Sequence, residues 1–203
     1  MVSERRELVG FSRTIDAEAM LAGYRKGIFA MSYWGVLYKW WSPDPRGVLP
    51  LDNLRVTRSL RKSVGRFTTA IDGDFDAVVQ ECADPGRFGG WIDAGLARGY
   101  RQLHEMGYAH SVETRDDAGN LVGGLFGINI GGFFSGESMF HSSRDASKVA
   151  LVTLVERLRG TGQPILLDTQ WRTEHLTSLG VIDMDRAAYL ERLASVIDAP
   201  QAL

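Results

Sequence analysis

The segment from residue 133 to residue 170 constrains the fold most, because it has the pattern of two strands joined by a helix. An apolar run closes on residues 136 to 138, a helix with apolar residues at intervals of three and four is predicted from about residue 145 to 159, and a second apolar run ends at residues 168 to 170. A crossover of this length makes the two strands parallel neighbours. The segment therefore predicts a mixed α/β fold in which the ends of these two strands meet.

Three polar residues, Glu137, Asp168 and Gln170, stand at the ends of these apolar runs. Strand side chains alternate between faces, which predicts that Asp168 and Gln170 point the same way and that Thr169 points away from them. Polar groups at the end of an apolar unit cost free energy unless they bind one another or a ligand. An Asp after a buried strand is also a common cap or turn residue, but a cap does not require the other two. We interpret the three residues as a candidate catalytic site.

Composition places the chain among ordinary globular proteins. It has 203 residues, 44% apolar and 24% charged, enough for one core with a small appended lobe. No apolar run approaches the length of a membrane span and the N-terminus lacks the apolar core of a signal peptide, so we expect a cytoplasmic location. The single cysteine, Cys82, excludes an internal disulfide and is expected to be buried, and the four histidines show no metal-binding spacing. No metal site is predicted.

Basic residues gather in one short segment although the net charge of the chain is −2. Residues 54 to 66 carry +5 and no acid, which leaves −7 on the rest. The basic residues are Arg55, Arg58, Arg61, Lys62 and Arg66. Their spacing places most of them on one side of a helix, with Leu60 and Val64 on the other. Such a stripe can bind phosphates, although an ordinary solvated helix face has the same pattern.

The remaining patterns predict an α/β order with a boundary near residue 84. A smaller N-terminal lobe, residues 1–83, contains an aromatic segment at 28 to 41 and the basic helix; residues 84–203 form the larger domain. A loop is predicted at residues 84 to 90. Other predicted helices are residues 16–26, 74–82, 93–106 and 185–194, with Asp16 and Asp185 as caps, and other predicted strands are 67–71, 110–114 and 121–130.

Nine motifs together carry a specific resemblance. They are AGYRKGIFAM (22–31), WWSPDPRGVL (40–49), SLRK (59–62), GWIDAGLARGYRQLHEMGYAHSVE (90–113), LVGGLFGI (121–128), FFSGESMF (133–140), DASKVAL (145–151), LLDTQ (166–170) and HLTSLG (175–180). In this order the set resembles the bacterial leucyl/phenylalanyl-tRNA protein transferases. The resemblance implies a C-terminal domain with the fold of the acetyl-CoA-dependent N-acetyltransferases (GNAT-like), here residues 84–203, and no cofactor.

The resemblance also implies an activity and its partners. The enzyme would take Leu or Phe, less readily Met, from aminoacyl-tRNA and join it to a protein beginning with Arg or Lys, which marks that protein for N-degron degradation. Asp168 and Gln170 match the catalytic pair of the family, and Glu137 matches its acid near the acceptor peptide. Trp40, Trp41 and Trp91 match tryptophans near the aminoacyl-adenosine, and Arg58, Arg61, Lys62 and Arg66 match the cluster that holds the tRNA acceptor stem. We expect a monomer.

The expected chemistry is aminolysis of the ester that joins the amino acid to tRNA. We expect Asp168 to accept a hydrogen bond from the Gln170 carboxamide, so that the Gln170 oxygen faces the amine, and Glu137 to attract the cationic acceptor. Candidates for the apolar amino-acid pocket are Met31, Phe126, Phe134, Ser138, Met139 and Phe140. Thr169 replaces the Cys common in the family, and GIFAM replaces GIFPW. Because alternation turns Thr169 away, little effect is expected from it.

Three other functions remain open at this point. An acetyl-CoA-dependent N-acetyltransferase would use a glycine-rich phosphate cradle, but RLRGTG at residues 157 to 162 falls where a helix is predicted to end. A serine hydrolase would use Ser138, Asp168 and His175, which follow the order of an α/β-hydrolase triad. A non-catalytic RNA-binding module would use only the basic stripe and the aromatic residues, leaving Glu137 and Gln170 unexplained.

Overall fold

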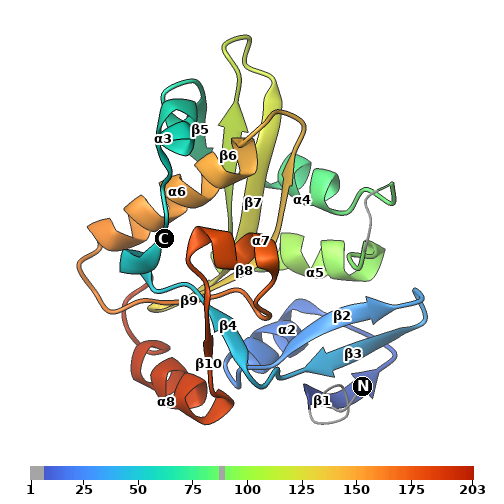
Figure 1. Ribbon diagram of the computed structural model, residues 1–203. Coiled ribbons are helices and arrows are strands. Elements are labelled where there is room, and N and C mark those ends of the chain that lie inside the picture. Colours follow the sequence, from blue (N-terminus) through green and yellow to red (C-terminus); the bar gives the residue numbers. More distant parts are fainter. Residues whose placement is uncertain (1–6, 87–89) are drawn as a thin grey trace.

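The computed structural model describes residues 7–86 and 90–203, so that residues 87–89 of the predicted loop at 84 to 90 lie outside the described residues. Within the described part, seven strands form one sheet in the order β10-β4-β9-β8-β7-β6-β5 (Figure 1). These strands are β10 (Ile182–Met184), β4 (Arg46–Val48), β9 (Leu166–Asp168), β8 (Phe133–His141), β7 (Leu121–Ile130), β6 (Ala109–Arg115) and β5 (Thr68–Ile71). A separate sheet of β1 (Leu8–Ser12), β3 (Leu37–Trp41) and β2 (Phe29–Tyr33) lies beside it.

The predicted strand pair is confirmed. β8 and β9 are parallel neighbours, with Ser135 opposite Asp168, and helix α6 (Ala146–Gly160) joins them. The other ladders of the large sheet are antiparallel, so the sheet is mixed, as predicted. α6 ends at Gly160, which means that residues 157–162 do not begin a helix and cannot form the phosphate cradle of an acetyl-CoA site in that way.

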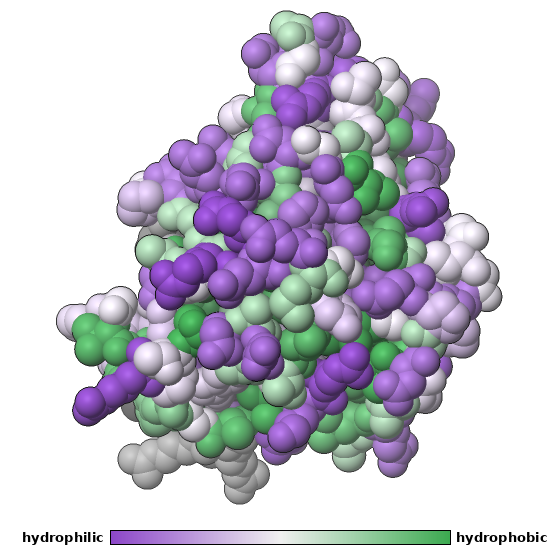
Figure 2. Space-filling view, turned by 180° about the vertical axis from the view of Figure 1, so that it is seen from behind, coloured by the Kyte–Doolittle hydropathy of each residue, from purple (hydrophilic) through white to green (hydrophobic). Residues whose placement is uncertain are grey.

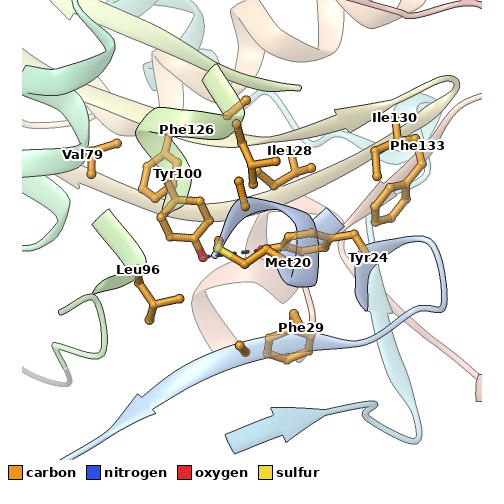
Figure 3. Close-up of a cluster of buried hydrophobic side chains, with 14 of the residues drawn as sticks. Met20, Tyr24, Phe29, Val79, Leu96, Tyr100, Phe126, Ile128, Ile130 and Phe133 are labelled. Carbon is orange, nitrogen blue, oxygen red and sulfur yellow. Dashed lines mark hydrogen bonds between the residues drawn. The ribbon is translucent and has the colours of Figure 1, made fainter. Parts of the chain in front are cut away.

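Helices cover both faces of the large sheet (Figure 1). One face carries α6 and α7 (Glu174–Leu179), and the other carries α4 (Phe75–Cys82), α5 (Ala94–Glu105), α2 (Ala17–Tyr24) and α8 (Arg186–Val196). Each face has its own apolar core: Phe134, Leu154 and Leu167 belong to the α6 side, and Phe126 belongs to the other. Figure 3 shows part of this second core, in which Tyr24 of α2 and Tyr100 of α5 point toward one another.

Side-chain caps explain where several helices begin. Asp16 accepts from the Ala19 N–H at 2.8 Å, which confirms its prediction as the cap of α2. Asp185 stands at the N-cap position of α8, as predicted, but its side chain makes no capping hydrogen bond. Asp44, distant in sequence, accepts from the Arg186 N–H at 3.1 Å instead.

Strands β1 to β4 and β10 were not predicted from the sequence. β2 and β3 lie in the aromatic segment, where no alternation is visible, and β4 has only three residues and begins with Arg46. β4 fits between β9 and β10 because Gly47 has no side chain: a Cβ there would lie 2.7 Å from the Trp171 carbonyl carbon. The strand therefore brings Arg46 against the end of β9.

On the face seen from behind, hydrophobic residues lie in separate patches among hydrophilic ones (Figure 2). Across the described ranges, none of the helices has both the length and the apolar character needed to cross a membrane.

The division into a lobe of residues 1–83 and a domain of residues 84–203 stays a prediction. Strands β4 and β5 belong to the large sheet, and the three-stranded sheet is formed within residues 8–41.

Candidate active site

A cavity of about 290 Å³ lies beside the middle of β8 and the end of β9, and residues of α6 and α7 also line it. Its wall is mainly aliphatic, formed by Leu49, Leu125, Met139, Leu151, Leu154, Leu167, Leu176 and Val181. Its other lining residues are Gly136, Glu137, Ser138, Thr169, Gln170, Thr173 and His175. The cavity thus combines an apolar wall with a few polar groups, which is typical of a small-molecule binding site.

A β-bulge lies at Glu137, one of the residues that line this cavity. In the β7–β8 ladder Gly127 lies opposite Gly136 and Phe126 opposite Ser138, which leaves Glu137 as the extra residue. Ser135 and Glu137 are two residues apart on this strand and share a face, and the Ser135 hydroxyl donates to Glu137 Oε1 at 2.8 Å. After the bulge the alternation shifts by one residue, so that Met139 packs on the α6-side core and lines the cavity while Phe140 joins the other core. The bulge therefore brings Met139 to the cavity beside the polar pair.

Asp168 is fully buried and its carboxylate is occupied by protein groups. Arg46 binds both oxygens, Nε to Oδ1 at 2.9 Å and the terminal nitrogen to Oδ2 at 2.6 Å. Tyr189 donates its hydroxyl to Oδ2 at 3.0 Å, and the main-chain N–H of Gln170 donates to Oδ1 at 2.9 Å. Asp168 makes no bond to His175 in the described structure, so the three residues of the hydrolase alternative do not form a triad.

Arg46 is a buried cation, 1% exposed, held in place on several sides. It donates to the Gly27 carbonyl at 2.9 Å and lies over the rings of Phe29 and Tyr189. Burial alone would lower the pKa of its guanidinium, but the charge of Asp168 more than offsets this and raises that pKa above its ordinary value. The guanidinium therefore stays charged, and its hydrogen bonds to Asp168 fix the end of β9 against β4.

Gln170 lies in a turn just past the end of β9, and its side chain still reaches the Asp168 side of the strand, where it bonds Ser135. Its φ of 59° lies in the left-handed region, and the Asp168 carboxylate holds its N–H in this turn. Gln170 lines the cavity, and Thr169 lines it on the same face as Leu167. Strand alternation therefore points Thr169 away from Asp168, as predicted, but that face borders the cavity, so the expectation that Thr169 lies away from the site is wrong. The Thr169 hydroxyl is buried there without a hydrogen-bond partner among the described residues.

The Gln170 carboxamide is held by Ser135 and not, as predicted, by Asp168. Its Nε2 donates to the Ser135 hydroxyl at 2.8 Å. Glu137 extends the network, because its Oε2 accepts a hydrogen bond from the hydroxyl of Tyr100 at 2.7 Å. The hydroxyl oxygens of Tyr100 and Tyr24 are in turn 3.5 Å apart (Figure 3). The chain of bonds therefore runs from Gln170 at the cavity into the core.

Burial raises the pKa of Glu137 to about 7, although hydrogen bonds from Tyr100 and Ser135 act in the opposite direction. Burial and the nearby Glu137 charge also raise the pKa of the Tyr100 phenol well above its ordinary value. Tyr100 is therefore a donor at neutral pH, and Glu137 titrates in the range where the enzyme would work. At the cavity mouth, burial and the nearby Lys148 lower the pKa of His175.

The residues predicted for the amino-acid pocket divide into two groups. Ser138 and Met139 line the cavity. Phe126, Phe134 and Phe140, at most 6% exposed, are core residues outside the lining, and Met31 packs against the core of the α5 side. Leucines therefore form most of the apolar lining of the cavity, where phenylalanines were predicted.

The three tryptophans lie on the side of the N-terminal sheet. The Trp41 ring packs 5.9 Å, centroid to centroid, from Trp171, the residue after Gln170. Trp91 lies 6.3 Å from the ring of Tyr100. Trp40 donates its indole N–H to the hydroxyl of Ser12. None of the three lines the cavity itself, although Trp41 and Trp91 each touch a neighbour of the polar network.

The basic segment forms helix α3 (Arg58–Val64) as predicted. Leu60 is buried, and the predicted phosphate-binding residues Arg58, Arg61, Lys62 and Arg66 are exposed. These four make no ion pair with any residue of the ranges 7–86 and 90–203, which leaves their charge available to an anionic partner. α3 is tied to the start of α6 by a hydrogen bond from Ser63 to Asp145 at 3.1 Å, next to the end of β8.

Sequence reasoning missed several residues of the network: Arg46, Ser135, Tyr100, Tyr24 and Tyr189. Only Arg46 left a signal, as a charged residue directly before a short apolar run. Tyr24, Tyr100 and Tyr189 come from helices distant in sequence and have no pattern that marks them, whereas Ser135 stands two residues before Glu137 in the same strand.

Comparison with known proteins defines the chain as an aminoacyltransferase. Its residues 48–194 match the family "Leucyl/phenylalanyl-tRNA protein transferase", and the chain belongs to this family. A leucyl/phenylalanyl-tRNA--protein transferase of Stutzerimonas stutzeri (strain A1501) is 49% identical over 203 residues, covering 98% of this chain and 89% of that protein. One from Maricaulis maris (strain MCS10) is 48% identical, covering 91% and 88%. Among solved structures, L-PGS from Bacillus licheniformis aligns with a TM-score of 0.40 and 14% identity over 83% of this chain and 57% of that one.

Proposed function

We propose that the chain transfers Leu or Phe, less readily Met, from aminoacyl-tRNA to the N-terminal Arg or Lys of acceptor proteins and so marks them for N-degron degradation. The observation that carries the proposal is the aliphatic cavity with Gln170 at its polar end. Burying one CH₂ of the amino acid in such a wall gains about 0.8 kcal/mol, which favours Leu or Phe over Ala or Gly. The resemblance of the sequence to the family supports the same substrates.

In the proposed reaction the acceptor amine attacks the ester carbonyl of aminoacyl-tRNA. A C–N bond forms, the C–O bond to the 3′ ribose breaks, and the proton of the amine passes to the leaving ribose oxygen. An N-terminal amine has a pKa of about 7.7 to 8, so a useful fraction is neutral and positioning contributes more than a strong base. The Gln170 carboxamide oxygen accepts a hydrogen bond from the amine, and main-chain N–H groups of the glycine-rich strands stabilise the oxyanion.

Asp168 and Glu137 support Gln170 without reacting themselves. Asp168 holds the Gln170 turn in this proposal, which is supported by the hydrogen bond from the Gln170 N–H and by the enclosure of the carboxylate by Arg46 and Tyr189. Glu137 contributes negative charge near the cationic acceptor. The exposed arginines of α3 bind tRNA phosphates, and Trp41 and Trp91 lie beside the terminal adenosine. Residues 84–203 would form the GNAT-like acyltransferase domain of a cytoplasmic, monomeric enzyme.

The test uses the purified full-length chain, radiolabelled Leu-tRNA, and two peptides that differ only in an N-terminal Arg or Asp. We expect labelled peptide with N-terminal Arg and none with N-terminal Asp. Gln170→Ala should abolish turnover while Leu-tRNA still binds. Transfer that is equal with both peptides, or none with either, would contradict the proposed activity.

A further inference from the structure

Ser135 lies between the two functional side chains of the polar network. It is fully buried on β8, and its hydroxyl oxygen is 2.8 Å from Gln170 Nε2 and 2.8 Å from Glu137 Oε1. A hydroxyl donates one proton and accepts through its lone pairs. The directions of the two hydrogen bonds are therefore coupled through this one atom.

An ionised Glu137 sets these directions, because a carboxylate only accepts. It takes the Ser135 proton, and Ser135 is left to accept from the NH₂ group of Gln170. Gln170 Oε1, which receives no described donor, is then the carboxamide atom free to face the cavity that Gln170 lines. This is the orientation that suits an incoming amine.

We propose that Ser135 is a positioning residue that transmits the charge of Glu137 to the orientation of the Gln170 carboxamide, so that the cavity presents an acceptor only while Glu137 is ionised. This inference rests on the proposed aminoacyl transfer. It makes Ser135 and Glu137 a device that acts through Gln170 and not on the substrate itself.

Protonation of Glu137 reverses the chain. Tyr100 donates to Oε2, so the added proton sits on Oε1 and is donated to Ser135. Ser135 then donates its own proton to the Gln170 oxygen, the carboxamide turns round, and an NH₂ group faces the amine. The titratable groups that face Glu137 are Tyr100 of α5, Tyr24 of α2, Asp168 of β9, Arg46 of β4 and Tyr189 of α8. Because burial raises the pKa of Glu137 to about 7, both states are reached near neutral pH.

Glu137→Gln would lock the reversed state without changing the size of the side chain. Tyr100 donates a hydrogen bond, so it selects the oxygen of the new amide, and the amide NH₂ then faces Ser135. Ser135 must donate to Gln170, as when Glu137 is protonated. If Glu137 only attracted the cationic acceptor, the same variant would raise the KM for the peptide and leave kcat at saturation nearly unchanged.

The experiment measures kcat and KM for transfer from Leu-tRNA to the Arg peptide at pH values on both sides of 7, for Ser135→Ala, Glu137→Gln and the double variant. Ser111→Ala is the matched control, since Ser111 is fully buried on β6 of the same sheet and its hydroxyl also donates to a buried glutamate, Glu113. We expect Ser135→Ala to lower kcat about tenfold, as expected for one orienting hydrogen bond, with the KM for Leu-tRNA unchanged. The kcat of wild type should fall as the pH decreases below about 7. This acidic limb of the pH–rate profile should be absent from both single variants.

The double variant supplies the decisive comparison. If Glu137 acts through Ser135, Glu137→Gln costs nothing further in kcat once Ser135 is Ala. Additive losses, a wild-type kcat for Ser135→Ala, or a uniform loss that keeps the limb of wild type would overturn the inference while transfer by wild type upholds the proposed function. Absence of transfer by wild type overturns both. If Ser135→Ala does not fold, the kcat and pH profile of the isosteric Glu137→Gln decide alone.

Discussion

Replacing Asp168 by Ala would leave a buried guanidinium without its counter-ion. The Arg46 and Asp168 side chains are 1% and 0% exposed, and the carboxylate accepts four hydrogen bonds: two from Arg46, one from Tyr189 and one from the Gln170 N–H. Removing one partner of such a pair exposes the other to the full cost of an uncompensated buried charge.

The expected loss of unfolding free energy is about 3–5 kcal/mol. For a chain of this length that corresponds to a decrease in Tm of roughly 6–20 °C. The exposed pair Arg101–Asp76, with side chains 49% and 62% exposed, is the matched control. Breaking it with Asp76→Ala should cost less than about 1 kcal/mol, because water screens the charges.

The assay is equilibrium urea unfolding followed by circular dichroism, with wild type, Asp168→Ala, Asp76→Ala and the apolar pair Arg46→Met with Asp168→Leu. The apolar pair should recover part of the loss, since no charge stays buried alone. If Asp168→Ala unfolds at the same urea concentration as Asp76→Ala, the buried charge does not stabilise the junction of β4 and β9 and the reasoning fails.

Three further predictions concern the cavity, the basic helix and pH. Leu154→Phe narrows the aliphatic cavity and should lower kcat/KM with Phe-tRNA roughly tenfold more than with Leu-tRNA, by overpacking; an equal effect on both would show that Leu154 does not contact the amino acid. Arg58→Ala with Arg61→Ala should reduce the slope of log affinity for tRNA against log salt by about 1.4 to 1.8, and an unchanged slope in filter binding would remove α3 from the tRNA interface. Because the pKa of Glu137 is raised to about 7, the folded state holds a proton that the unfolded state loses from about pH 4.5, so stability falls as pH rises between these values. Glu137→Gln should therefore be more stable than wild type in thermal unfolding above pH about 7, by a margin that shrinks toward pH 5.

The strand–helix–strand unit could be predicted because each of its parts has a recognisable local sequence pattern. The helix of residues 146–160 repeats apolar residues at three and four, the flanking runs are apolar, and the crossover length alone makes β8 and β9 parallel. The exposed face of α3 followed in the same way from the spacing of its arginines. Periodicity was sufficient where one face is buried.

The details of the site could not be predicted, because they depend on departures from periodicity. The bulge at Glu137 shifts the alternation of side chains along β8, and a left-handed residue, Gln170, follows the end of β9. Thr169 lies on the face of Leu167, as alternation predicts, but that this face borders a cavity is decided by α6 and α7, which pack there from other parts of the chain. Arg46 of β4 and Tyr189 of α8 contact Asp168 only because the chain folds so that these elements lie side by side. No local sequence pattern predicts that contact.

The place of β4 in the sheet has a consequence during synthesis on the ribosome. Arg46 precedes its partner Asp168 by 122 residues, and β4 pairs on its other edge with β10, later still in the chain. At about 5–20 residues per second the nascent chain carries this arginine without its carboxylate for roughly 6–24 s. The β4 segment must stay hydrated until translation is nearly complete, so the last third of the polypeptide closes the structure around a strand made in the first quarter.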